Sequence, residues 1–382
     1  MTVKLFHTEN NQLMEDISIE ILRSGNIASG EYVNKFERGL ESVLNQKHVV
    51  TLNNMSNAIF LALYLSGVSY GDEVITTSFA CMATNSSIAT LGATVRWVDL
   101  ERQSVCMDPA QLELAINERT KAVILYHTSG YPAQVKIISE ICRKHNIVLI
   151  EDCDNAFLAT LDGINVGSFG DFSIYSFYPN RLINTLDGAA LVCRDKKDAI
   201  RAKKLSRYGI DNTNFRNDLG EINSQSDIPE AGWAMGLSNY CSALGYVQLG
   251  GLGLKLERTR RNTLTLIDGL SHYSEIQIIN PVAGSKPSYW TLLILCHERE
   301  ALLRFLRSKN IHASSLHYRN DSYSCFVSKS NVELTNTKYI QEKILSIPCG
   351  WWLTEDDLQS IISSFAEIMP NLNKTFGPSG CI

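Results

Sequence analysis

The chain has 382 residues, of which 45% are hydrophobic and 20% are charged, and its formal net charge is −5. A chain of this length can bury a large core and suggests about two domains. Because it is mildly acidic and has no block of lysine and arginine, neither nucleic acid nor an anionic membrane is expected as a partner.

The ten cysteines are scattered along the chain and form no CxxC pair. Without a signal peptide ahead of them, this pattern favours reduced, mostly buried thiols and therefore a cytoplasmic location. The longest apolar runs are too short to cross a bilayer, so no membrane insertion is expected. No metal site is predicted.

Over the first two thirds of the chain, short β-branched runs alternate with amphipathic stretches of helical length. This alternation is typical of βα units that build a mostly parallel sheet covered by helices. The predicted strands are 48–52, 73–76, 94–98, 121–126, 147–151, 172–177 and 189–193. The predicted helices are 56–65, 82–91, 109–116, 135–145 and 195–208. The sequence therefore predicts a three-layer α/β domain.

The pattern changes after residue 254. A long polar helix is followed there by the apolar strand YWTLLILC, by a helix from about residue 298 and by a closing helix over 354–368. These elements predict a smaller α+β domain at the C-terminal end.

We expect three parts in the chain. Residues 31–254 form the large α/β domain, residues 255–382 form the small α+β domain, and residues 1–30 are an N-terminal segment that packs with the small domain. The segment 212–229 has few apolar residues and is predicted as a long loop.

Several motifs follow one another in a specific order: LRSGNIASGEYVNKFERGLESVL, GDEVITTSFACMATNSSIATLGATVRWVDL, INERTKAVILYHTSG, IEDCDNAFLATLDGINVGSFGDFSIYSFYPNR, LSNYCSALGYVQL and SIPCGWWLTEDDLQSII. Together they resemble the DegT/DnrJ/EryC1/StrS sugar aminotransferases over nearly the whole chain. The resemblance implies the aspartate-aminotransferase-like fold (fold type I) of pyridoxal-phosphate enzymes. It also implies a homodimer with sites at the subunit interface, and nucleotide-linked keto-sugar substrates.

The resemblance also implies that Arg181 stands where the family carries the lysine that forms a Schiff base with pyridoxal phosphate. A guanidinium stays protonated and has no lone pair with which to attack an aldehyde. We therefore do not expect conventional transamination.

Other positions keep part of the implied cofactor site. Asp152 matches the aspartate that hydrogen-bonds the pyridine nitrogen, and it follows an apolar strand at the end where α/β sheets place ligand groups. Ser176 matches a serine that helps to hold the phosphate. Asn155 stands where a glutamine or histidine is usual. His127 matches a histidine at a strand end, and its role is equally open between catalysis and structure.

The phosphate-binding turn departs from the family pattern. Its Gly-Thr pair is matched by Met55 and Ser56. Ser56 keeps a hydroxyl and can cap the following helix, but Met55 removes the glycine that allows close backbone approach.

Further cofactor contacts are also changed. Cys81 replaces the aromatic residue that stacks on the ring, unless the alignment slips and Phe79 takes that place. An asparagine and an arginine supplied by the partner subunit are matched by Gly236 and Ser238. Together these changes indicate a weakened cofactor site.

Three functional hypotheses remain open. In the first, the protein is an enzyme in which Arg181 holds an anionic group and Asp187 or His127 acts as acid or base, with pyridoxal or pyridoxamine phosphate bound without a covalent link. In the second, it is an inactive homologue that dimerises with an active paralogue. In the third, it is a remodelled enzyme without a cofactor. We favour a sugar-aminotransferase-like protein of carbohydrate or natural-product biosynthesis that lacks the catalytic lysine and binds a small molecule, such as a nucleotide sugar.

Two aromatic segments near the C-terminal end receive a structural interpretation. His317 and Tyr318 are predicted to lie in a surface loop. Trp351 and Trp352 are predicted to be packing residues ahead of a helix that Thr354 caps.

Overall fold

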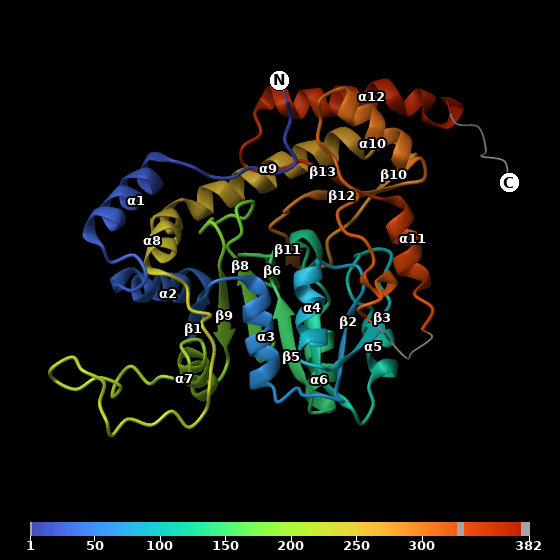
Figure 1. Cartoon of the computed structure of the whole chain (residues 1–382). Coiled ribbons are helices and arrows are strands. Elements are labelled where there is room, and N and C mark those ends of the chain that lie inside the picture. The colour runs from blue at the N-terminus through green and yellow to red at the C-terminus, as the bar shows by residue number, and fades with distance from the viewer. Residues whose placement is uncertain (1, 327–331, 376–382) are drawn as a thin grey trace.

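Seven strands form the central sheet of the computed structural model, which describes residues 2–326 and 332–375 of the chain (Figure 1). In spatial order they are β1 (Val49–Leu52), β9 (Ala189–Cys193), β8 (Phe172–Ser176), β5 (Val148–Asp152), β4 (Thr120–Tyr126), β2 (Glu73–Thr77) and β3 (Thr94–Val98). Only β9 runs antiparallel to its neighbours β1 and β8. The predicted mostly parallel sheet is confirmed.

Helices cover both faces of this sheet and make three layers. One face carries α3 (Met55–Leu65), α4 (Met82–Thr90) and α7 (Lys196–Leu205), and the other carries α2 (Glu31–Leu44), α5 (Pro109–Ala115) and α6 (Val135–Lys144). Successive strand side chains point to opposite faces. In β4, for example, Ile124 belongs to the core on the α3 side and Leu125 to the core on the α6 side. Most predicted element boundaries lie within two residues of the observed ones.

The start of α3 differs from the prediction. Asn54 is the residue that caps this helix, because its side chain accepts a hydrogen bond of 2.8 Å from the backbone N–H of Asn57. Ser56, which could have been the cap, is instead the second residue of the helix. The reason is that Asn54 has the extended backbone and the short polar side chain that a capping position requires.

The C-terminal part is built on a small antiparallel sheet. Its strands are β10 (Ile276–Ile278), β12 (Leu292–Cys296) and β13 (Ile344–Ile347), and its helices are α9 (Leu252–Leu270), α10 (Arg299–Ser308), α11 (Thr335–Lys343) and α12 (Glu355–Thr375). The closing helix α12 is longer than predicted because it continues through Pro370. A third sheet joins β11 (Ser285–Lys286) to β6 (Thr160–Leu161) and β7 (Ile164–Asn165).

The N-terminal residues contact both parts of the molecule. Val3 pairs with Ile311 beside the small sheet, whereas α1 (Gln12–Ser24) packs against α8 (Asn239–Gln248). The division of the chain at residues 30 and 254 stays a prediction.

The predicted loop over 212–229 contains no regular helix or strand, only a single bridge between Arg216 and Ile222. Figure 1 shows it as the yellow-green segment that extends away from the body beside α7. Leu219 is 86% exposed and Ile222 is 63% exposed, so the loop carries apolar side chains in water.

Six of the nine described cysteines are buried, so most of them lie inside the protein as predicted, and no disulfide joins any of the nine. None of the helices in the described part of the chain is long and apolar enough to cross a membrane.

Candidate functional site

The candidate site lies at the carboxyl ends of three neighbouring strands. Tyr126 is the last residue of β4, Asp152 the last of β5 and Ser176 the last of β8. Parallel strands end at the same edge of a sheet, and that edge is where open α/β sheets bind ligands. The fold therefore brings these three side chains together.

Asp152 is a fully buried carboxylate with few hydrogen-bond donors. One oxygen accepts a hydrogen bond of 2.7 Å from the Thr84 hydroxyl, and the other accepts one of 3.1 Å from the backbone N–H of Asp154. Burial, and then the nearby charge of Asp154, raise the pKa of Asp152 to about 7. This residue can therefore hold or release a proton near neutral pH.

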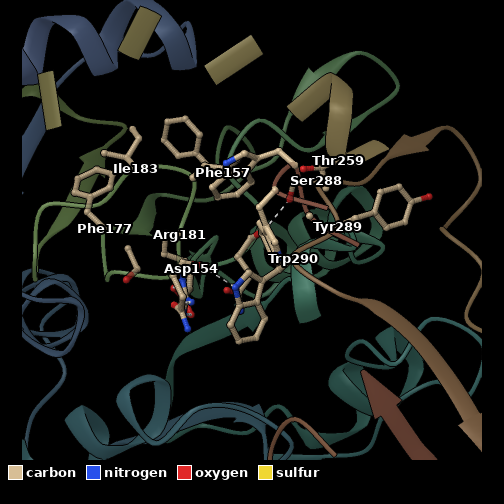
Figure 2. Close-up of a pocket in the computed structure, with 16 residues that line it drawn as sticks. Asp154, Phe157, Phe177, Arg181, Ile183, Thr259, Ser288, Tyr289 and Trp290 are labelled. Carbon is tan, nitrogen blue, oxygen red and sulfur yellow. Dashed lines mark hydrogen bonds and ion pairs between the residues drawn. The ribbon is translucent and has the colours of Figure 1, made fainter. Parts of the chain in front are cut away.

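Arg181 is held by Asp154 in a two-pronged ion pair (Figure 2). Its Nε and Nη2 atoms donate to the two carboxylate oxygens at 2.6 and 2.7 Å, and Nη1 donates to the side chain of Asn180. Burial opposes the charge of the guanidinium, but Asp154 raises the pKa of Arg181 above its usual value. The pair neutralises itself, and three of the five N–H groups of Arg181 are already used.

Aromatic rings enclose this ion pair. The guanidinium carbon lies 4.6 Å from the ring centroid of Trp290, and Phe6 stacks on the same ring at a centroid distance of 4.4 Å. The indole N–H of Trp290 donates to the Asn180 carbonyl at 3.1 Å. Cation–π contact and stacking therefore fix Arg181 in place.

A pocket opens beside the ion pair, and in Figure 2 Arg181, Asp154 and Trp290 lie together on one side of it. Trp351 and Trp352, which were predicted to be packing residues, line the pocket and also pack edge to face on each other. The cavity volume is about 30 Å³, enough for about two water molecules. A larger ligand would have to open the pocket.

His317 reaches the site from the C-terminal part of the chain. Its Nε2 atom lies 3.2 Å from the hydroxyl of Tyr126, and its ring packs edge to face on Phe79. Asn155 donates a hydrogen bond of 2.7 Å to the same hydroxyl. Both residues lie in an irregular segment, as predicted, and Tyr318 is 55% exposed. His317 is only partly exposed, because its ring contacts Tyr126 and Phe79, which are distant in sequence.

Both ring nitrogens of His127 make hydrogen bonds within the protein. Its Nε2 atom lies 3.1 Å from Glu151, and its Nδ1 atom accepts from the backbone N–H of Ala133 at 3.1 Å. Both His127 and Glu151 are completely buried. A ring that accepts at Nδ1 and donates at Nε2 is neutral and has no free nitrogen, which favours the structural role.

Both carboxylate oxygens of Glu151 are also occupied by hydrogen bonds. It also accepts from the backbone N–H groups of Gly167, Phe169 and Gly170 at 2.7, 2.7 and 2.6 Å. The potential ligand atoms of His127, Glu151 and Cys153 lie within 4.8 Å of one another, but these hydrogen bonds explain the cluster without an ion.

The remaining predicted residues are spread around the site. Ser176 lines the pocket and accepts from the backbone N–H of Tyr178 at 3.3 Å. Cys81 is half-buried at the start of α4, and burial raises the pKa of its thiol. Asp187 is exposed and does not line the pocket, and partial burial of its carboxyl group raises its pKa.

Two more predicted residues lie outside the pocket. Gly236 forms a bridge with Leu52, and Ser238 caps α8 by accepting from the backbone N–H of Cys241 at 3.1 Å. Neither lines the pocket in the described part of the chain.

Three residues of the site, Asp154, Tyr126 and Trp290, were not predicted from the sequence. Asp154 could have been found, because it follows Asp152 by two residues and provides a carboxylate for an arginine in the same segment. Tyr126 and Trp290 give no comparable signal, since aromatic residues at strand ends are common in cores.

Comparisons with known proteins agree with this fold. A model of the DegT/DnrJ/EryC1/StrS aminotransferase family matches residues 8–366. The pleiotropic regulatory protein of Geobacillus stearothermophilus is 30% identical over 355 residues, which cover 91% of this chain and 92% of that protein. The GDP-perosamine synthase of Vibrio cholerae is 26% identical over 352 residues, which cover 90% and 92% of the two chains.

A solved structure shows the same architecture. The sugar aminotransferase CalS13 from Micromonospora echinospora superposes with a TM-score of 0.90 and 25% sequence identity, over 96% of this chain and 99% of that chain. The predicted architecture is confirmed by this agreement.

Proposed function

The chain belongs to the DegT/DnrJ/EryC1/StrS aminotransferase family, and from that premise we propose that it binds a nucleotide-linked sugar without carrying out conventional amino transfer. The names of its relatives support a sugar ligand, since one is a GDP-perosamine synthase and another a sugar aminotransferase. The ion pair of Arg181 with Asp154 is the observation that carries the second part of the proposal.

The proposal rests on matching position 181 to the lysine of the family. A guanidinium has no lone pair for an aldehyde, and Asp154 stabilises its charged form. No lysine is among the described residues that line the pocket. The amine that conventional transamination needs is therefore missing from this site.

The family implies pyridoxal phosphate, and the residues around the site do not fit it as a covalently held cofactor. Asp152 suits a ring nitrogen, because each of its oxygens keeps a lone pair beyond the bonds from Thr84 and Asp154. At the first turn of α3, however, the Asn54 side chain already uses the N–H of Asn57.

We further propose that the protein acts as a homodimer. In support, α1 exposes Leu13, Ile19 and Leu22, and the loop over 212–229 exposes Leu219 and Ile222. Exposed apolar side chains of this kind are typical of surfaces that contact another chain. The same surfaces suit the second candidate function, an inactive chain that completes the site of an active paralogue.

Calorimetric titration with UDP-glucose and GDP-mannose tests ligand binding. A parallel absorbance titration with pyridoxal phosphate and with pyridoxamine phosphate, followed by borohydride reduction and intact mass, tests for a covalent link. We expect saturable binding of a nucleotide sugar and no adduct. An adduct together with amino transfer from glutamate to a keto-sugar nucleotide would contradict the proposal.

A further inference from the structure

The hydroxyl of Tyr126 is the meeting point of three side-chain and backbone groups. It lies 2.7 Å from Nδ2 of Asn155, 3.4 Å from the backbone nitrogen of Ser129 and 3.2 Å from Nε2 of His317. Tyr126 is 1% exposed, so water does not compete for these contacts. Every hydrogen bond of this hydroxyl is therefore made within the protein.

Counting protons assigns a direction to each bond. Nδ2 of Asn155 and the nitrogen of Ser129 can only donate, so they use the two lone pairs of the Tyr126 oxygen. Burial raises the pKa of Tyr126 well above its usual value, so the hydroxyl keeps its proton and donates it to Nε2 of His317. Nε2 of His317 must then be the unprotonated nitrogen.

His317 consequently carries its proton on Nδ1. Burial lowers the pKa of His317 to about 4, so the ring is neutral at physiological pH. Nδ1 makes no hydrogen bond to any described residue. The ring therefore offers one donor that nothing in the described chain uses.

Asn155 offers the complementary group. Its Nδ2 atom is used by Tyr126, but its Oδ1 atom is buried and has no partner among the described residues. A buried acceptor without a donor costs free energy, and such a group calls for an explanation. A ligand that supplies an O–H would remove that cost.

We propose that Tyr126 holds His317 and Asn155 as a donor and acceptor pair that recognises one hydroxyl group of the sugar ligand. The hydroxyl accepts from Nδ1–H of His317 and donates to Oδ1 of Asn155. A hydroxyl suits the pair because it has one proton and two lone pairs. Since the Arg181 and Asp154 charges beside it cancel each other, the subsite selects a neutral group.

This inference rests on the proposed function, because it assigns the specificity of the same site. Tyr126 acts through the other two residues and is a positioning residue. His317 and Asn155 contact the ligand. The first test needs no ligand: ¹⁵N NMR of histidine-labelled protein reports which ring nitrogen carries the proton. We expect Nδ1–H for His317 in the wild-type protein and loss of that preference in Tyr126→Phe. A proton on Nε2 in the wild type would overturn the assignment.

The second test measures binding of UDP-glucose and of its 2-, 3- and 4-deoxy analogues. The analogue that lacks the recognised hydroxyl should bind at least about tenfold more weakly to the wild type, because the pair is then left unsatisfied. Tyr126→Phe should bind that analogue and UDP-glucose equally. Equal binding of all four ligands by the wild type would overturn the inference.

Matched variants separate recognition from folding. Tyr131→Phe is the control, because Tyr131 is also 1% exposed and its hydroxyl also accepts from a backbone N–H, that of Leu293 at 3.3 Å. Tyr131→Phe should still bind UDP-glucose more tightly than the analogue that lacks the recognised hydroxyl. His317→Asn keeps a donor near the Nδ1 position and should show the same preference. His317→Gln places its amide near the Nε2 position and should lose this preference. The opposite result for this pair would overturn the inference even if Tyr126→Phe failed to fold.

Failure of the proposed function has a different signature. If the wild type binds none of these nucleotide sugars, the proposed sugar ligand is wrong and the recognition of a sugar hydroxyl falls with it. The NMR experiment still decides separately whether Tyr126 sets the tautomer of His317.

Discussion

Glu151 and Asp152 are consecutive residues of β5 and both side chains are fully buried, yet their surroundings differ. Glu151 accepts from three backbone N–H groups and contacts His127. Among the described residues, Asp152 accepts only from Thr84 and Asp154. Successive side chains of a strand face opposite sides of the sheet. The Glu151 carboxylate therefore has a structural role, whereas the Asp152 carboxylate belongs to the candidate site. The number of donors, and not burial, separates the two.

Replacing Glu151 should have the largest effect. Glu151→Gln puts an NH₂ group where a carboxylate oxygen now accepts backbone N–H bonds, so at least one buried donor loses its partner. We expect a loss of about 3–5 kcal/mol in the free energy of unfolding, measured by urea denaturation. A loss below about 1 kcal/mol would show that the backbone turn at Gly167 to Gly170 does not depend on this carboxylate.

Removing Arg181 should have the next largest effect. Arg181→Met leaves Asp154 buried without its partner, and Asp154 is only 2% exposed. We expect a loss of about 2–4 kcal/mol in the free energy of unfolding, since an unpaired buried charge is costly. The matched control is the double variant Arg181→Met with Asp154→Leu, which should recover most of the loss. If the double variant is no more stable than the single one, the ion pair is not the main contribution of Arg181.

Replacing Asp152 should change the free energy of unfolding in the opposite direction from replacing Glu151. Its pKa is about 7 in the folded protein and about 4 in an unfolded chain, so folding favours its protonated form. The cost of ionising it is absent below about pH 4, grows as the pH rises and is complete above about pH 7. Asp152→Asn removes that cost. We expect it to be more stable than the wild type by about 1–2 kcal/mol at pH 8 and equal to it at pH 4.

Urea denaturation of both proteins at several pH values measures this difference. Glu151→Gln provides the comparison, because its loss of stability comes from lost hydrogen bonds and should persist at pH 8. An Asp152→Asn variant that is less stable than the wild type at every pH would mean that Asp152 is as structural as Glu151.

The fold was largely predictable because its signals are local. The alternation of apolar runs that defines β4, β5 and α6 depends on neighbouring residues and survives in a single sequence. The start of α3 was missed by one residue, since Asn54 and Ser56 are both plausible caps and only the backbone geometry distinguishes them. Asp152 was placed correctly at the end of an apolar strand.

The site was less predictable because its contacts are not local. His317 meets Tyr126 across 191 residues of chain, and no periodicity within a short window reports such a meeting. His127 shows the reverse problem: a histidine at a strand end suggests chemistry, but the donors and acceptors around it, above all Ala133 and Glu151, occupy both ring nitrogens.

Arg181→Lys has the smallest expected effect, because we expect no covalent adduct with pyridoxal phosphate. It tests most directly whether Asp154 controls the chemistry of residue 181. The new ammonium would lie beside Asp154, which now binds the guanidinium at 2.6 and 2.7 Å. A carboxylate at that distance stabilises the charged form and raises the pKa of a lysine, so the neutral amine that attacks an aldehyde would be scarce. We expect no adduct with pyridoxal phosphate after borohydride reduction, as measured by intact mass.

The double variant Arg181→Lys with Asp154→Ala removes the carboxylate and should form an adduct. If the single variant already forms one and transfers an amino group from glutamate, Asp154 does not control the site and residue 181 is the only difference that matters. If the double variant forms none, the altered first turn of α3 also prevents the cofactor from binding.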